Sequence, residues 1–172
     1  ISWGEIVETA RSYTGEPMVF DVNDPDFFNP SSMADALWNH LGQSGQCSGE
    51  IHWPALLQSV YNALACSYAV AVKELEEVTQ EQYATVYVVG GGSRVDYLNQ
   101  LCADVTGKTV VTGAQESTSL GSIGIQLTYF DPALSLQDIR KILSGSIESR
   151  RFAPHDRLYG EKLVDAYRRL VR

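Results

Sequence analysis

Basic residues, cysteines and long apolar runs are all scarce in this chain of 172 residues. Its 13 Lys and Arg against 21 Asp and Glu give a net charge of −8, which argues against nucleic-acid binding, because such surfaces need clustered positive charge. No apolar run reaches the ~18 residues of a membrane span, and no signal peptide is recognisable. We therefore expect no nucleic-acid and no membrane partner. The basic residues that gather near the C-terminus are interpreted as helix-end charges: Arg150, Arg151, Arg157, Arg168 and Arg169.

The few metal-binding residue types also lack metal-binding patterns. The three cysteines are an odd number without C-x-x-C spacing, which excludes a zinc ribbon and fits a reducing cytoplasm. The three histidines are scattered, without the i, i+4 spacing of a metal pair. Asp21, Asp24 and Asp26 alternate as in a calcium loop, but the glycine and the distal glutamate of that loop are missing. We interpret these aspartates as turn formers and expect no metal site in the chain.

Periodicity and turn residues predict a helix-rich α/β chain. Helices are predicted over residues 3–13, 33–41, 54–78, 94–105, 119–130, 135–143 and 156–171. Strands are predicted over residues 84–89, apolar enough to be buried on both faces, and 108–112. The central order of strand, glycines, helix, strand and helix indicates a parallel strand pair.

Three consecutive glycines, Gly90, Gly91 and Gly92, separate the first predicted strand from its helix. Missing side chains allow close approach, and the free N–H groups at a helix start favour an anion, so this order suits a nucleotide. A purely structural turn, which packs the helix on the strand, explains one or two glycines well and three poorly. The dinucleotide fingerprint fails because Val95 occupies its last glycine position, and the Gly-Lys-Ser/Thr of a Walker loop is absent. A Rossmann-type oxidoreductase is therefore a weaker alternative.

A second cluster of small residues lies in "ESTSLGSIGIQL", residues 116–127. Gly121 and Gly124 stand inside a predicted helix, where each glycine costs about 1 kcal/mol relative to alanine. Their spacing indicates a helix face pressed against a flat ligand or another backbone. Packing of this helix against the sheet is the alternative.

Both clusters belong to a longer stretch, "VVGGGSRVDYLNQLCADVTGKTVVTGAQESTSLGSIGIQL", which resembles the C-terminal, nucleotide-binding half of the FGGY carbohydrate kinases. The preceding "NDPDFFNPSSM" is similar to the rhamnulokinase group of that family, and the resemblance extends from about residue 1 to residue 127. It implies an actin-like (ribonuclease H-like) ATPase fold. Residues 1–172 would then form part of the C-terminal lobe.

The resemblance also implies which residues bind the nucleotide. Gly90, Gly91 and Gly92 would lie beside it, with Gly91 in direct contact. Ser93 and Asp96, in an S-x-x-D pattern, would form the capping box of the following helix. Gly121 would let its helix approach as a wall of the adenosine pocket.

ATP with Mg²⁺ is the implied cofactor, and the implied reaction of the parent enzyme converts L-rhamnulose to L-rhamnulose 1-phosphate. The family's sugar site and catalytic aspartate lie in an N-terminal lobe, so we expect this chain to be a fragment without catalytic residues or activity of its own. Exposed apolar surface on such a fragment predicts a homodimer. Xylulose, fuculose or gluconate as the sugar, and a non-catalytic actin-like regulatory domain, are the open alternatives.

Overall fold

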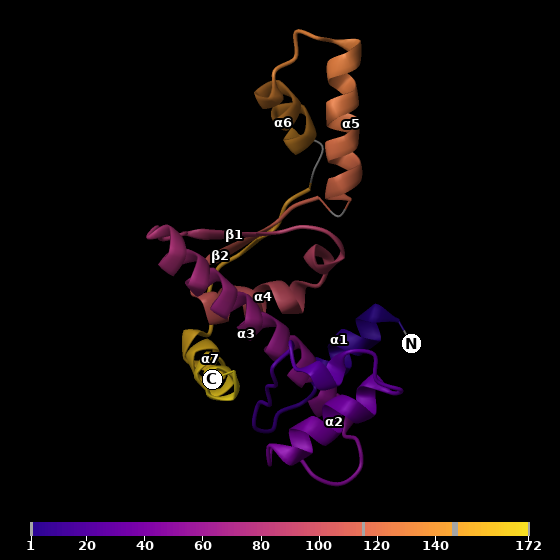
Figure 1. The fold of residues 1–172 in the computed structure, drawn as a ribbon, viewed down its shortest axis with the longest axis vertical. Coiled ribbons are helices and arrows are strands. Elements are labelled where there is room, and N and C mark those ends of the chain that lie inside the picture. Colours follow the sequence, from indigo (N-terminus) through magenta and orange to yellow (C-terminus); the bar gives the residue numbers. More distant parts are fainter. Residues whose placement is uncertain (1, 115, 146–147, 172) are drawn as a thin grey trace.

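The computed structural model describes residues 2–114, 116–145 and 148–171. In Figure 1, α5 and α6 form a hairpin that extends from a small sheet, on the side away from α1 and α2. The helices are α1 (Trp3–Arg11), α2 (Met33–Gln43), α3 (Trp53–Thr79), α4 (Asp96–Thr106), α5 (Ser117–Phe130), α6 (Leu136–Gly145) and α7 (Arg157–Leu170). The strands are β1 (Thr85–Val88), β2 (Thr109–Thr112) and β3 (Arg151–Phe152), and the 3-10 helices are η1 (Pro25–Phe27) and η2 (Gly91–Arg94). The seven predicted helices are confirmed, each end within two residues of its expected place.

The sheet has the order β1-β2-β3. β1 and β2 are parallel, with Thr85 opposite Thr109, as the sequence predicts. β3 was not predicted; it is two residues long and runs antiparallel to β2, with Phe152 opposite Val110. A strand this short carries no alternation that a sequence pattern could detect.

The prediction that the first strand is buried on both faces is wrong. The Tyr87 side chain is 70% exposed, and Val89 directly after β1 is also exposed. Within the described residues β1 pairs on one side, with β2, and its other edge is free. An apolar composition indicates that a strand will be covered, but not by which segment.

The long helix α3 organises the body of the protein. It packs against α1, α4 and α7, and its buried residues include Ala63, Ala65, Cys66 and Ala69, whose small side chains let neighbouring helices come close. By length and composition α3 could also cross a membrane, but 56% of its most apolar part is buried inside the protein, as in a core helix. Burial raises the pKa of the Cys66 thiol to about 12, so this cysteine stays protonated and inert at neutral pH.

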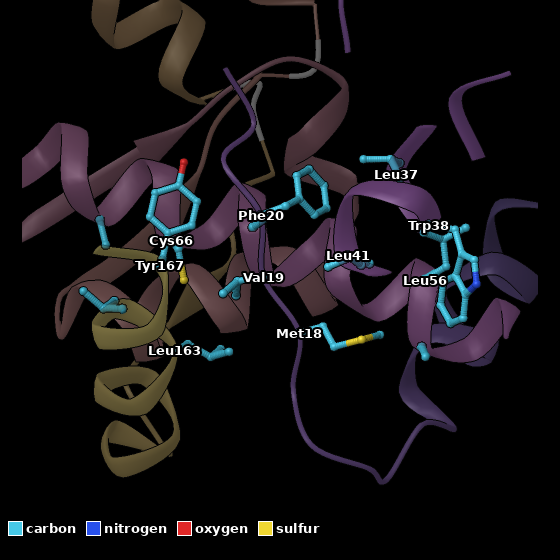
Figure 2. Close-up of a cluster of buried hydrophobic side chains, with 14 residues drawn as sticks. Met18, Val19, Phe20, Leu37, Trp38, Leu41, Leu56, Cys66, Leu163 and Tyr167 are labelled. Atoms are coloured by element: carbon cyan, nitrogen blue, oxygen red, sulfur yellow. The ribbon is translucent and has the colours of Figure 1, made fainter. Parts of the chain in front are cut away.

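The largest core cluster forms where the extended segment of residues 18–20 inserts between α2, α3 and α7. Figure 2 shows the side chains of Val19 and Phe20 among those of Leu41 and Tyr167. The Val19 backbone has a side-chain partner: its N–H donates to Gln46 Oε1 (2.9 Å), and its carbonyl accepts from Gln46 Nε2 (2.8 Å). The backbone of Val19 is therefore satisfied in the core, although the segment belongs to no sheet.

The start of α7 is tied to α4 by the buried carboxylate of Asp104. Its Oδ1 accepts from the N–H groups of His155 (2.7 Å) and Asp156 (3.2 Å), and from Gln100 Nε2 (3.0 Å). A carboxylate at a helix N-terminus is favoured by the unpaired N–H groups there. This contact fixes the crossing of α7 over α4.

An ion pair at the far end of α3 leads to the first testable prediction. Lys108 Nζ lies 2.6 Å from Glu76 Oε1 and donates to the Tyr83 carbonyl (2.7 Å), while the Tyr83 N–H donates to the same glutamate oxygen (2.8 Å). The hydrogen bond from Lys108 lowers the pKa of Glu76 below its ordinary value of 4.5. This pair therefore stabilises the fold above about pH 4.5, and its contribution is lost as the pH falls through the lower, folded-state pKa.

We expect the Glu76→Gln variant to lose less stability than the wild type between pH 5 and pH 3, measured by urea unfolding at each pH. Glu77→Gln is the matched control, because the exposed carboxylate of Glu77 pairs with Lys73 at the longer distance of 3.7 Å. Identical pH profiles for the wild type and Glu76→Gln would contradict the assigned role of this pair.

Candidate functional site

The three glycines follow β1 at the edge of the sheet where the parallel strands end. Gly90 has φ 77° and ψ −163°, a conformation that essentially only glycine adopts. Its N–H donates to the Ala114 carbonyl (3.0 Å), and the Gly113 N–H donates to the Val88 carbonyl (2.7 Å). These two bonds hold the segment that follows β1 next to the segment that follows β2. Ligands of parallel sheets bind at this edge.

Gly91 and Gly92 have no comparable structural reason to be glycine. They begin η2 without a positive φ, and a Cβ at either position would find no described atom within 4 Å. A side chain would therefore enter open space and not the protein interior. The missing side chains leave room above the backbone for a group from outside the described chain, which is what a ligand-binding turn needs.

The predicted capping box of Ser93 and Asp96 is wrong. Val95 is the N-cap of α4, which has no side-chain cap among the described residues. Because η2 turns the backbone before α4 begins, the Ser93 hydroxyl points back and donates to the Gly90 carbonyl (2.7 Å). Ser93 is buried and closes the glycine turn instead of capping the helix. Asp96 stands in the first turn of α4, where its carboxylate pairs with Arg150.

Two residues that sequence patterns did not select support this turn. The Ser93 carbonyl accepts from Asn99 Nδ2 (3.1 Å) and from Arg150 Nη2 (3.0 Å). The interpretation of Arg150 as a helix-end charge is wrong, because it directly precedes β3 and its side chain reaches the turn. It lies 57 residues from Ser93, so no local pattern could have joined them.

A mostly apolar groove of about 480 Å³ runs beside the turn, between α3, β1 and α4. Gly92 and Asn99 line it together with Tyr68, Val88 and Cys102. Asn99 is buried, and its Oδ1 has no hydrogen-bond partner among the described residues. Burial raises the pKa of the Cys102 thiol to about 11, so this thiol is not a nucleophile at neutral pH.

The two glycines of α5 serve different purposes. A Cβ at Gly124 would lie 2.8 Å from Ile139 Cγ2 and 3.0 Å from Leu143 Cδ1, so this glycine lets α6 pack closely on α5. A Cβ at Gly121 would find no described atom within 4 Å. The alternative in which this helix packs on the sheet is wrong, since α5 stands away from the sheet in Figure 1 and pairs with α6.

Five of the six predicted site residues lie in the continuous segment of residues 90–96. The sixth, Gly121, lies one turn into α5. The segment offers open space beside Gly91 and Gly92, while its one hydroxyl, on Ser93, is bonded within the turn. Such a site can bind a ligand. Of the described side chains at the turn, none is placed as an acid, a base or a nucleophile.

Asp24, Asp26 and His40 form a separate group of possible metal ligands. One carboxylate oxygen of each aspartate and one ring nitrogen of the histidine lie within 4.8 Å of one another. The position of His40 beside this loop was not predicted from the sequence. Asp24 and His40 have structural neighbours: Asp24 Oδ1 accepts from the Asp26 N–H (2.9 Å) at the start of η1, and the His40 ring packs edge-on against Phe27. This agrees with the interpretation of the aspartates as turn formers.

Comparison with known proteins identifies relatives of this chain. Residues 2–129 match the family model described as "FGGY family of carbohydrate kinases, C-terminal domain". The chain is 32% identical over 151 residues to the rhamnulokinase of Oceanobacillus iheyensis, covering 87% of this chain and 32% of that protein. It is 33% identical over 156 residues to the rhamnulokinase of Halalkalibacterium halodurans, covering 91% and 33%. The chain thus spans about a third of the length of the curated relatives it matches.

Solved structures share the fold. Xylulose kinase from Rhodospirillum rubrum aligns with 98% of this chain and 32% of its own, with a TM-score of 0.66 and 16% identity. Gluconate kinase from Lactobacillus acidophilus aligns with 71% of this chain and 25% of its own, with a TM-score of 0.55 and 19% identity. The expected fold, a helix-rich part of an actin-like ATPase, is confirmed.

Proposed function

We propose that this chain, which belongs to the FGGY family of carbohydrate kinases, is the nucleotide-binding part of an ATP-dependent sugar kinase. The observation that carries the proposal is the open space beside Gly91 and Gly92, where no described atom accounts for the missing side chains. The turn lies at the edge of a parallel strand pair, the place where nucleotides bind in α/β folds.

In the proposed complex the residues of this chain bind and orient ATP. The backbone of Gly90–Gly92 lies against the adenosine end, and the first turns of α5, with Gly121, form the neighbouring wall. When bound with ATP, Mg²⁺ would supply positive charge to offset the negative charge that develops on the phosphates during transfer. We assign no metal ligand and no catalytic base to this chain, because phosphoryl transfer needs a sugar hydroxyl, a base and the γ-phosphate in line, and the glycine turn holds no such group.

L-Rhamnulose is the sugar that we propose for the whole protein, with L-rhamnulose 1-phosphate and ADP as products. The two curated relatives, which are about a third identical in sequence to this chain, are named rhamnulokinases and support this choice. Xylulose and gluconate kinases among the structural neighbours, and fuculose by family resemblance, define the competing substrates. A cytoplasmic location fits three free cysteines and bacterial relatives.

The test is a coupled assay of ADP release by the full-length protein with ATP, Mg²⁺ and a panel of L-rhamnulose, xylulose, fuculose and gluconate. We expect kcat/KM for L-rhamnulose to exceed that for every other sugar by at least about tenfold, or 1.4 kcal/mol. A higher value for another sugar would overturn the substrate and keep the enzyme class. Binding of ATP without phosphorylation of any sugar would favour a non-catalytic domain, and binding of NAD in place of ATP would favour an oxidoreductase.

A further inference from the structure

We propose that Arg150 is a positioning residue for the nucleotide, because its guanidinium joins the glycine turn to the first turn of α4. This inference rests on the proposed function. Arg150 lies outside residues 2–129, which match the family model, so the match assigns it no role.

The base of the Arg150 side chain is held firmly by the sheet. The Arg150 N–H donates to Thr112 Oγ1 (2.8 Å), and the Thr112 N–H donates to the Arg150 carbonyl (2.9 Å). From this anchor the two ends of the guanidinium reach different partners. Nη2 donates to the Ser93 carbonyl (3.0 Å), and Nη1 pairs with Asp96 Oδ1. The planar, two-pronged guanidinium is suited to such a bridge, and a lysine ammonium is not.

The glycine turn needs an anchor of this kind. Three consecutive glycines lose more conformational freedom on ordering than any other residues would. The turn is fastened at its start by the bond from Gly90 to Ala114, whereas at Gly91 and Gly92 no described atom lies close enough for a Cβ to pack on it. Its other end is fastened at the Ser93 carbonyl by Arg150 and Asn99. The positions of the amides between these anchors therefore depend on both ends.

Loss of Arg150 affects the position of the turn more than the stability of the fold. Asn99 still donates to the Ser93 carbonyl, so no buried acceptor is left without a partner. The side chains of Arg150 and Asp96 are 43% and 60% exposed, and exposed ion pairs contribute little to stability. The Asp96 carboxylate, however, would lose its cationic partner three residues from the turn. A free carboxylate there opposes binding of an anionic ligand such as ATP.

The test compares Arg150→Met, Arg150→Lys and Arg151→Met in the full-length kinase, measuring KM for ATP, KM for the sugar, kcat and Tm. For Arg150→Met we expect the ATP KM to rise on the order of fivefold or more, with the sugar KM within about twofold and Tm within about 2 °C of the wild type. Arg150→Lys keeps the charge but cannot bridge both partners, so it should restore part of the ATP KM. Arg151 is the matched control, because this exposed neighbour in β3 should leave all four quantities unchanged.

An ATP KM within twofold of the wild type in Arg150→Met would overturn the inference. Equal rises in the KM for ATP and the KM for the sugar would also overturn it. So would a large fall in Tm without a selective rise in the ATP KM, because either result assigns Arg150 a merely structural role. These results differ from failure of the proposed function, in which the wild-type protein itself shows no ATP-dependent sugar phosphorylation.

Discussion

Replacement of Gly91 by valine is expected to raise the ATP KM of the full-length kinase at least tenfold, about 1.4 kcal/mol, without changing its stability. A Cβ at Gly91 finds no described atom within 4 Å, and Gly91 is not among the residues with positive φ. The chain therefore accepts the side chain, which then occupies the space that we assign to the nucleotide. The measurement is steady-state kinetics with ATP varied at saturating sugar, together with thermal unfolding.

The control for this variant is Gly4→Val, an exposed position in α1 whose Cβ would lie 3.9 Å from the nearest atom, Ser2 Oγ. It should leave the ATP KM unchanged. An unaltered ATP KM in Gly91→Val would refute the contact between this glycine and the nucleotide. A fall in Tm that accompanies the rise in KM would mean that the open space beside the turn does not explain the glycine.

Replacement of Gly160 by valine is expected to destabilise the chain by on the order of 3 kcal/mol, roughly 6–12 °C in Tm for a protein of this size. A Cβ at Gly160 would lie 2.6 Å from the Asp104 carbonyl carbon and 2.9 Å from the Val105 N atom. These are backbone atoms of α4 and cannot rotate away, so α7 has to move. The shift would also stretch the bonds by which Asp104 holds the start of α7. Thermal and urea unfolding measure the effect.

Gly160→Ala already introduces the clashing Cβ and should be destabilising as well, although alanine favours a helix. Gly4→Ala provides the comparison, since the same change in the exposed helix α1 should raise the stability by about 0.5–1 kcal/mol. If Gly160→Ala also stabilises the chain, α7 does not pack against the backbone of α4 in solution as closely as in the structure.

Local patterns in the sequence were sufficient for the helices and for the parallel strand pair. The alanine-rich apolar pattern of residues 54–78 predicted α3 to within one residue at each end, because a long amphipathic helix carries many turns of the same signal. α4 ends at Gly107, which adopts the left-handed conformation typical of a helix C-terminus. The glycine segment was selected because three adjacent glycines are costly to order without a ligand, and its role as a nucleotide site stays a prediction.

The parts that were missed depend on contacts between distant residues. β3 is defined by its pairing with β2, and Arg150 by its reach to Ser93, and neither partner is visible from the local sequence. The capping box failed because Ser93 and Asp96 have the right spacing, but the glycine turn continues through Ser93 as a 3-10 helix. The burial expected for β1 failed because composition does not name the segment that covers a strand.

The hairpin of α5 and α6 has a consequence for the dynamics of the protein. Its close packing lies within the hairpin, where Gly124 meets Ile139 and Leu143, and Figure 1 shows it standing clear of the body. Elements that bury their surface mainly against each other open as a cooperative unit, with less free energy than global unfolding requires. Backbone amides of α5 should therefore exchange with deuterium sooner than those of α3, whose opening disrupts the whole core. A ligand that touches both the glycine turn and α5 would slow this exchange, because it would join the two units.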